Sequence, residues 1–295
     1  MSYIKDFCLK YEYPIDAVEE LESAYKKLEG SEAFSEFREC IAAYEADYNF
    51  DEKPIFEKIA AMSEKVGIHQ YTLQLLYLIS LTPHLKKLYE REGISDFIYD
   101  GSVLDLKWKL NECHKIFGIW GVSTTWGIGF FKLILFALGR LQFNIYYFNN
   151  DLFPPEDMGV LGEPFIGIHI PSCGPLNYEE CLKSYDMAAE FFSKRYNLKR
   201  IVFGCRSWLV SRDNALMLPP DSNIVKFLSD FKVLKVIIDK ENKCYRCMFP
   251  IPEFPEDVST LPQETGLQRA FVKRLMEGHS INEAFGVFEY KKDKM

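Results

Sequence analysis

The stretch FIGIHIPSCGPLN, residues 165–177, carries a histidine, a serine and a cysteine where a strand pattern gives way to a helix pattern. Alternation over 165–170 places His169 on the same strand face as Gly167, and the missing side chain of the glycine leaves that face open. A histidine at a strand end can act as a general base near neutral pH. It can equally be a core histidine bonded to a backbone carbonyl, and the sequence leaves both interpretations open.

The turn that follows, 171–176, precedes a helix for which Asn177 is the expected N-cap and Glu180 the partner in a capping box. A helix N-terminus offers unpaired N–H groups and a partial positive charge, which suit a phosphate or a carboxylate. Pro171 and Pro175 have no N–H to donate. The amides that remain for an anion belong to Ser172, Cys173, Gly174 and Leu176. A capped helix without any ligand is the alternative.

Three further side chains could take part in chemistry. Cys205 lies in the next predicted strand and would be near His169 if the two strands are neighbours; a small buried side chain is the alternative. Tyr146 belongs to a polar row on a strand over 141–148, which we expect to face solvent; if the row lines a cleft instead, Tyr146 is a candidate proton donor. Cys173 sits at a helix start, where thiol pKa values fall, so a Cys/His hydrolase is a further alternative.

The cysteines do not indicate a disulfide framework or a metal site. Eight of them are scattered along 295 residues without regular spacing, so we expect reduced thiols. Cys244 and Cys247 form a single CxxC inside a predicted hairpin, with neither a second pair nor a suitably spaced histidine. We therefore predict no metal site.

Charge divides the chain into two regions. Residues 1–115 carry 22 acidic and 14 basic side chains, and the remainder carries 21 of each. No basic patch dominates either region, which argues against nucleic-acid binding. The first residues lack a signal-peptide pattern, and the longest apolar stretch, 127–139, is too short to span a bilayer. We expect a soluble, cytoplasmic protein that does not bind membranes.

The secondary-structure pattern changes near 117–126. Before it, apolar residues at helical spacing predict helices over 14–30, 31–47, 54–66, 69–91 (broken near Thr82-Pro83) and 102–116. After it, the predicted helices cover 128–138, 176–196, 222–231 and 265–277. The predicted strands cover 141–148, 165–170, 200–208 and 285–290, with a hairpin of 232–239 and 244–249. This order predicts an α+β (α/β) fold: an all-helical domain over 1–120 and a mixed sheet flanked by helices over 121–295.

Five segments carry a resemblance to a known family: LGRLQF (138–143), IHIPSCGPLNYEECLKSYDMAAEFF (168–192), FGCRSWLV (203–210), LPPDSNIVKFLSDFKV (218–233) and LPQETGLQRAFVKRLMEG (261–278). Together they resemble the bacterial acyltransferase-domain proteins, which pair a helical N-terminal domain with a GNAT-like C-terminal domain. The resemblance implies an N-acyltransferase that uses acetyl-CoA or another acyl-CoA as co-substrate.

The order of elements agrees with this resemblance. In GNAT proteins a strand, a pyrophosphate-binding turn, a helix and a splayed next strand form the CoA site; here 165–170, 171–176, 177–196 and 200–208 occupy those places. The usual glycine-rich turn is replaced by PSCGPL. By this resemblance the CoA-binding residues are Ile170, Ser172, Cys173, Gly174, Leu176 and Asn177.

Direct acyl transfer requires removal of a proton from the amine, stabilisation of an oxyanion and protonation of the leaving thiolate. We predict His169 as the base, directly or through a water, and Cys205 or Tyr146 as the acid. The expected acceptor is a small-molecule or peptide amine. The helical domain would cover the cleft or mediate a homodimer, and both roles stay open. The alternatives are a non-catalytic GNAT-fold module that binds a ligand or partner, which the two prolines favour, and the Cys173 hydrolase.

Overall fold

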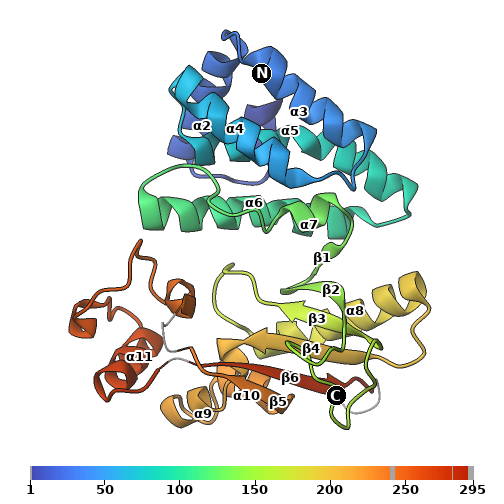
Figure 1. The fold of residues 1–295 in the computed structure, drawn as a ribbon, viewed down its shortest axis with the longest axis vertical. Coiled ribbons are helices and arrows are strands. Elements are labelled where there is room, and N and C mark those ends of the chain that lie inside the picture. Colours follow the sequence, from blue (N-terminus) through green and yellow to red (C-terminus); the bar gives the residue numbers. More distant parts are fainter. Residues whose placement is uncertain (1, 240–242, 281, 292–295) are drawn as a thin grey trace. The chain divides into compact units, whose positions relative to one another are not determined.

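A computed structural model describes residues 2–239, 243–280 and 282–291 of the chain. The chain forms two compact units, Met1–Phe136 and Ala137–Met295 (Figure 1). The first is helical, and the second is a mixed sheet with helices, which confirms the predicted fold class.

The first unit is built around one long buried helix. Its helices are α1 (Tyr3–Lys10), α2 (Ile15–Glu29), α3 (Phe34–Ala46), α4 (Glu52–Val66), α5 (Gln70–Arg91), α6 (Asp96–Phe117) and α7 (Ile128–Phe131). Every other helix of the unit contacts α5, most of whose residues are buried. An apolar helix with buried residues on all sides is expected at the centre of such a bundle. In the part of the chain that the structure describes, every helix is too short or too polar to cross a bilayer.

Helix α5 is continuous through Thr82-Pro83, so the predicted break is wrong. Pro83 lacks the N–H that would bond the carbonyl of Ile79 four residues back. The Thr82 hydroxyl donates to this Ile79 carbonyl instead, with an oxygen–oxygen distance of 2.7 Å. Since the neighbouring side chain satisfies the carbonyl, the helix passes through the proline.

The predicted helix over 128–138 is also wrong in its second half. Helix α7 ends at Phe131, and Leu133 adopts a left-handed backbone with φ of 55°. The next residues form strand β1 (Leu135–Leu138), which is buried throughout. A short, continuously apolar run fits a buried strand as well as a helix, so periodicity alone cannot decide between them.

The two units divide later than the sequence pattern indicates. Residues up to Phe136 pack on the helices: the Tyr44 hydroxyl donates to the Phe131 carbonyl at 3.0 Å, and the Phe136 ring lies 6.3 Å from the Tyr89 ring, centroid to centroid. The glycine-rich stretch near 117–126 is therefore a connection inside the helical unit.

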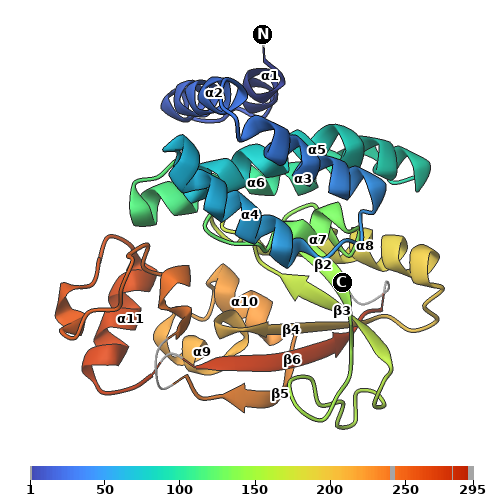
Figure 2. The same cartoon turned by 45° about the horizontal axis from the view of Figure 1, so that its top comes forward.

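The second unit contains a six-stranded sheet in the order β1-β2-β3-β4-β6-β5. After β1, its strands are β2 (Leu141–Tyr147), β3 (Pro164–His169), β4 (Val202–Ser207), β5 (Lys232–Ile237) and β6 (Glu283–Glu289). Its helices are α8 (Tyr178–Tyr196), α9 (Asp213–Met217), α10 (Asn223–Ser229) and α11 (Gly266–Met276). Figure 2 shows β4, β6 and β5 side by side, in the order that the strand pairing gives. Strands β3 and β4 are parallel, whereas β2–β3, β4–β6 and β5–β6 are antiparallel.

The predicted hairpin of 232–239 and 244–249 does not form. Strand β5 pairs with β6 instead, and 243–247 is a short 3-10 helix. The amides of Met248 and Phe249 bond back to the Tyr245 carbonyl, at 2.9 and 2.8 Å, which closes a local turn in place of a ladder.

Candidate active site

Strand β3 has α8 on one side of the sheet and a cavity on the other. Antiparallel pairing sets Tyr146 opposite Phe165 and Asn144 opposite Gly167, so these four residues share a face. Parallel pairing of Gly167 with Gly204 adds Gly204 to that face. The opposite face carries Phe203, whose ring lies 5.3 Å from the ring of Tyr185 on α8, centroid to centroid.

Strands β3 and β4 separate at their carboxyl ends. Their ladder consists of Ile166 with Phe203 and Gly167 with Gly204, although β3 continues to His169 and β4 to Ser207. The face over Gly167 is not open as expected, because the two glycines let aromatic rings lie directly against the strands at the last pair. A Cβ on Gly204 would lie 2.6 Å from the Phe165 ring, and one on Gly167 would lie 2.5 Å from the Tyr146 ring. The splay predicted from the order of elements is present.

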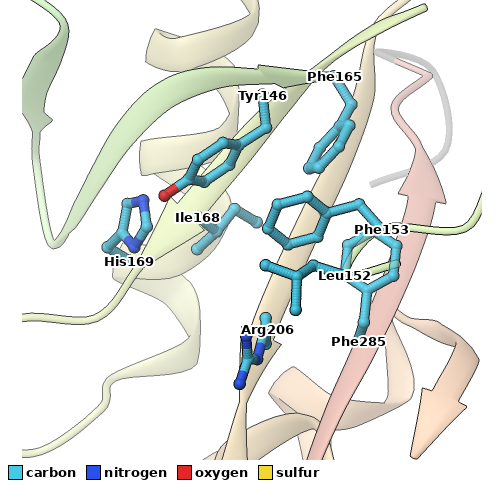
Figure 3. Close-up of a pocket in the computed structure, with 9 residues that line it drawn as sticks. Tyr146, Leu152, Phe153, Phe165, Ile168, His169, Arg206 and Phe285 are labelled. Atoms are coloured by element: carbon cyan, nitrogen blue, oxygen red, sulfur yellow. The ribbon is translucent and has the colours of Figure 1, made fainter. Parts of the chain in front are cut away.

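A cavity of about 270 Å³ lies beside this opening, shown in Figure 3. Its wall is mostly aromatic and aliphatic, with a histidine and an arginine among the lining side chains. The lining residues are Tyr146, Leu152, Phe153, Phe165, Ile168, His169, Gly204, Arg206 and Phe285. A concave apolar site with few polar groups is typical of a small-molecule site.

The connection between β2 and β3 supplies part of the wall. The Asn149 side-chain oxygen accepts from the amides of Asp151, Leu152 and Phe153, at 3.0, 2.8 and 3.2 Å, and so folds the connection tightly. The Phe153 ring then packs at a centroid distance of 5.4 Å from the Phe165 ring. No pattern in the sequence marks Leu152 and Phe153, because their place depends on how the loop closes.

His169 lines the cavity and is held by an amide side chain. Its Nε2 atom lies 3.0 Å from Oδ1 of Asn144. An amide oxygen can only accept, so Nε2 is the donor and carries the proton of the neutral ring. The ring is partly accessible, but the protein atoms around it exclude water and lower the pKa of His169 from 6.5 to about 4. The imidazole is therefore neutral at physiological pH, as a proton acceptor must be.

Tyr146 lies next to His169 in the same cavity. The two ring centroids are 5.9 Å apart, and Figure 3 shows the Tyr146 hydroxyl pointing toward the histidine. The polar row that contains it does not face solvent as predicted, because Gln142 is buried and Asn144 and Tyr146 are half-buried. The cleft-lining alternative is the observed one.

Cys205 lies on the opposite face of the sheet, so its predicted proximity to His169 is wrong. It pairs with Gly286 of β6 and is fully buried on the side that holds Phe203. Burial raises the pKa of the Cys205 thiol far above its usual range, and Glu283 adds to this. A thiol in that position is a packing residue.

The turn between β3 and α8 brings the predicted CoA-binding residues together. Ile170 follows the strand, Gly174 has a φ of 116°, and Asn177 is the N-cap of α8, with Oδ1 3.3 Å from the Glu180 amide. The reciprocal half of the predicted capping box is replaced, because the Glu180 carboxylate pairs with Lys183 at 2.8 Å. Ser172 is exposed, and Cys173 and Leu176 are half-buried.

Hydrogen bonds fix both ends of this turn. The Tyr178 hydroxyl in the first turn of α8 donates to Asp230 at 2.7 Å, which ties α8 to the end of α10. Burial raises the pKa of Asp230, against the effect of the hydrogen bonds from Tyr178 and Tyr185. On the other side, Arg140 donates to three carbonyls of the turn. Arg140 was not predicted from the sequence, although Gly139-Arg140 between two strands is a hairpin signal; the helix predicted over 128–138 concealed it.

The remaining charged and sulfur-containing candidates contribute little to the cavity. Arg206 lines it but pairs with Glu283 on β6, with a closest nitrogen–oxygen distance of 3.0 Å. Cys247 is exposed, and the side chain of Cys244 lies outside the described residues. Within the described ranges, no group of three or more His, Cys, Asp or Glu side chains has an arrangement that could hold a metal ion.

Solved structures of acyltransferases superpose on this chain. One, in complex with decanoyl-CoA and teicoplanin, superposes with a TM-score of 0.76 at 19% identity, covering 98% of this chain and 88% of that chain. Another, in complex with CoA and 10C-teicoplanin, gives a TM-score of 0.75 at 19% identity with the same coverage. A third, in complex with decanoyl-CoA, gives 0.71 at 20% identity, covering 97% and 87%. At these identities the likeness shows the fold.

Two protein-family matches divide the chain within a few residues of the boundary between its compact units. Residues 2–133 match the N-acyltransferase N-terminal domain, and residues 135–288 match the GNAT-like C-terminal domain. No curated protein matches the sequence. The second match alone covers more than half of the 295 residues, and the two together cover nearly all of them. The chain therefore belongs to the N-acyltransferases that join this helical N-terminal domain to a GNAT-like C-terminal domain.

Proposed function

We propose that this N-acyltransferase transfers the acyl group of an acyl-CoA directly to the amine of a small-molecule or peptide acceptor. The opening between β3 and β4 beyond Gly167 and Gly204, with the cavity beside it, is the observation that carries this proposal. The similar acyltransferase structures that hold CoA or decanoyl-CoA support the donor, and the complex with teicoplanin supports a small-molecule acceptor.

The donor would lie across the opening. Strand edges that lack ladder partners can pair with amide groups of an extended ligand, and the pantetheine arm of CoA is such a ligand. The diphosphate would lie at the turn Pro171–Leu176, next to the start of α8, with Ile170 and Asn177 at the two ends of the turn. The acyl chain would enter the cavity lined by Phe153 and Phe165, whose apolar wall favours an aliphatic chain over acetyl alone.

The reaction moves two protons. The amine nitrogen attacks the thioester carbonyl carbon, a C–N bond forms, and the C–S bond breaks as the oxyanion collapses. His169, neutral because its pKa is about 4, would accept the proton of the attacking amine, directly or through a water. Tyr146 would donate its hydroxyl proton to the leaving thiolate. Its hydroxyl forms no hydrogen bond with the residues that the structure describes, so it remains available to the ligand.

Ligand-dependent thermal stability tests the proposal. An acyl-CoA that binds only the folded chain at 100 times its Kd stabilises it by about 2.7 kcal/mol, which raises the Tm by roughly 5 °C in a chain of this size. We expect such a rise with octanoyl-CoA or decanoyl-CoA, and a smaller one with acetyl-CoA at the same concentration. An unchanged Tm with every acyl-CoA would favour the non-catalytic module. Selective labelling of Cys173 by a thiol-reactive probe would favour the hydrolase.

A further inference from the structure

Arg140 binds the turn before α8 through the main-chain carbonyls of the turn. Its Nη1 donates to the Pro171 carbonyl at 3.1 Å, its Nη2 to the Gly174 carbonyl at 2.9 Å and its Nε to the Pro175 carbonyl at 3.3 Å. A guanidinium presents five N–H groups in a rigid plane, and three of them are used here. One side chain therefore sets the orientation of three peptide groups within five residues.

The position of Arg140 is itself fixed. Its backbone amide donates to the Ser184 hydroxyl on α8 at 2.8 Å. The preceding Gly139 has a φ of 76°, and a Cβ there would lie 2.5 Å from the Met187 side chain, so the chain passes against α8 where only glycine fits. The β1–β2 connection thus holds Arg140 against the helix while its side chain reaches the turn.

Fixing these carbonyls also fixes the amides of the turn. The described peptide bonds are all trans, and in a trans peptide the C=O and the following N–H point in opposite directions. The Pro171 carbonyl faces Arg140, so the Ser172 amide points away from Arg140. The Pro175 carbonyl also faces Arg140, so the Leu176 amide points away from Arg140. The Gly174 carbonyl precedes a proline that has no N–H, so no donor is lost there.

Arg140 also places a positive charge at this turn. It forms no ion pair with any carboxylate of the described residues. Glu179 and Glu180 lie in the first turn of α8 and oppose an anion there, although Lys183 pairs with Glu180. The guanidinium offsets these carboxylates and raises the potential where a diphosphate would bind.

We infer that Arg140 is a positioning residue for the acyl donor, which aims the Ser172 and Leu176 amides at the donor's diphosphate. The inference rests on the proposed acyl-CoA function. It also gives the two prolines of PSCGPL a place in the site. Pro175 follows a carbonyl that Arg140 holds, and Pro171 supplies another, so neither removes an amide that Arg140 directs toward the ligand.

The test compares donors that are shortened from the nucleotide end: first the 3′-phosphate is absent, and then the adenosine and the diphosphate together. Octanoyl-CoA, octanoyl-dephospho-CoA and S-octanoyl-pantetheine are titrated into the full chain and into R140Q and R140K, with Kd measured by calorimetry. We expect R140Q to weaken both diphosphate donors by ~10-fold or more and to leave S-octanoyl-pantetheine within about twofold. R140K keeps the charge without the planar fork, so we expect it to recover only part of the loss.

R269Q is the matched control. Arg269 also donates to two main-chain carbonyls ahead of a helix, those of Gln263 and Glu264 at 2.9 and 3.0 Å, but at α11. We expect it to leave all three Kd values unchanged. Equal weakening of all three donors by R140Q would reduce Arg140 to a stabilising contact and overturn the inference. So would unchanged binding, or a loss confined to the donor with the 3′-phosphate. If the unmodified chain binds none of the donors, the proposed function itself fails.

Discussion

At the scale of single residues, the candidate site depends on the pairing of a histidine with an amide. Asn144 accepts from Nε2 of His169 and so selects the tautomer of the neutral ring. Burial lowers the pKa of that ring from 6.5 to about 4. The ring is therefore unprotonated throughout the physiological range, although the same lowered pKa makes it a weaker base than an ordinary histidine.

Removing the two proton-transfer groups tests their roles. We expect His169→Gln and Tyr146→Phe each to lower kcat by ~10²–10⁴-fold, because each deletes one proton transfer and leaves the shape of the cavity nearly intact. Acyl transfer followed by mass spectrometry measures the effect. Tyr147→Phe, on the exposed opposite face of the same strand, is the control and keeps full activity. Full activity of His169→Gln would remove His169 from the mechanism.

The pKa of His169 predicts how stability depends on pH. The folded chain resists protonation of this ring, whereas the unfolded chain binds a proton near pH 6.5. The unfolding free energy therefore has its full value above pH 6.5 and falls as the pH drops toward 4, by on the order of 3 kcal/mol. His169→Gln can still donate to Asn144 but does not titrate, so its unfolding free energy lacks this component. Urea unfolding between pH 4 and 7.5 measures the difference.

An exposed histidine provides the control for that experiment. His279→Gln removes a solvent-exposed ring and is measured in parallel. A pH dependence in His169→Gln equal to that of the unmodified chain would show that the ring titrates normally in the fold.

At the scale of elements, the separation of β3 from β4 makes room for a ligand, and Gly204 lies at the point where it begins. Gly204→Ala would place a methyl group 2.6 Å from the Phe165 ring and 3.1 Å from the Phe285 ring, inside the cavity wall. We expect a cost of ~1–3 kcal/mol in unfolding free energy and a clear loss of acyl-CoA affinity. Denaturant unfolding and calorimetry check both.

The matched control is a glycine that, unlike Gly204, has room for a methyl group. Gly30, at the end of α2, has a negative φ of −81°, and a Cβ there would lie 3.6 Å from the Lys26 carbonyl oxygen, an ordinary contact. Gly30→Ala should be nearly neutral in stability and in binding. If Gly204→Ala is also nearly neutral in stability and in binding, the strands can move enough to accept the methyl group. That result would contradict the tight packing of the Phe165 and Phe285 rings against Gly204.

Helix α5 offers a second test at the element scale. Thr82→Val removes the hydroxyl that satisfies the Ile79 carbonyl opposite Pro83, and it also removes the partner of the Tyr3 hydroxyl at 2.6 Å. We expect a loss of ~1–3 kcal/mol because a buried acceptor is left without a donor. Ser80→Ala is the control: it removes a hydroxyl that donates to the Leu76 carbonyl, but that carbonyl keeps its helical amide donor. If Thr82→Val lowers the unfolding free energy by no more than Ser80→Ala does, this explanation is wrong.

Much of the site follows from local sequence signals. The period of two placed Gly167 and His169 on one face, and the Asn177 cap marked the start of α8; both are local properties of a short segment. Which face of β4 lies on the side of His169 is not a local property. It depends on the register between the strands, and a shift of one residue would exchange the two faces. That is why Cys205 was expected beside His169, while Gly204 and Arg206 hold that face.

The residues that the sequence did not reveal come from connections. Arg140 sits at the tip between β1 and β2, and β1 itself was concealed because a short apolar run also fits a helix. Leu152 and Phe153 reach the cavity only because Asn149 folds their loop. The fold class was accessible because helical spacing in the first region and alternation in the second are strong, repeated signals.

At the scale of the whole molecule, the chain joins a helical unit to the sheet unit that carries the candidate site, and both match N-acyltransferase domains. The excess negative charge belongs to residues 1–115, whereas the rest of the chain carries equal numbers of acidic and basic side chains. Attraction of an anionic donor would therefore depend on local groups such as Arg140 and the amides of the turn before α8. The covering of the cleft by the helical domain, or a homodimer formed through it, stays a prediction.

The most direct measurement is a crystal structure of the full chain with a non-hydrolysable octanoyl-CoA analogue. We expect the pantetheine arm between β3 and β4 beyond Gly167 and Gly204, the diphosphate at the turn Pro171–Leu176 and the acyl chain against Phe153. A donor bound elsewhere on the chain, with the opening between the two strands empty, would contradict the proposed donor site.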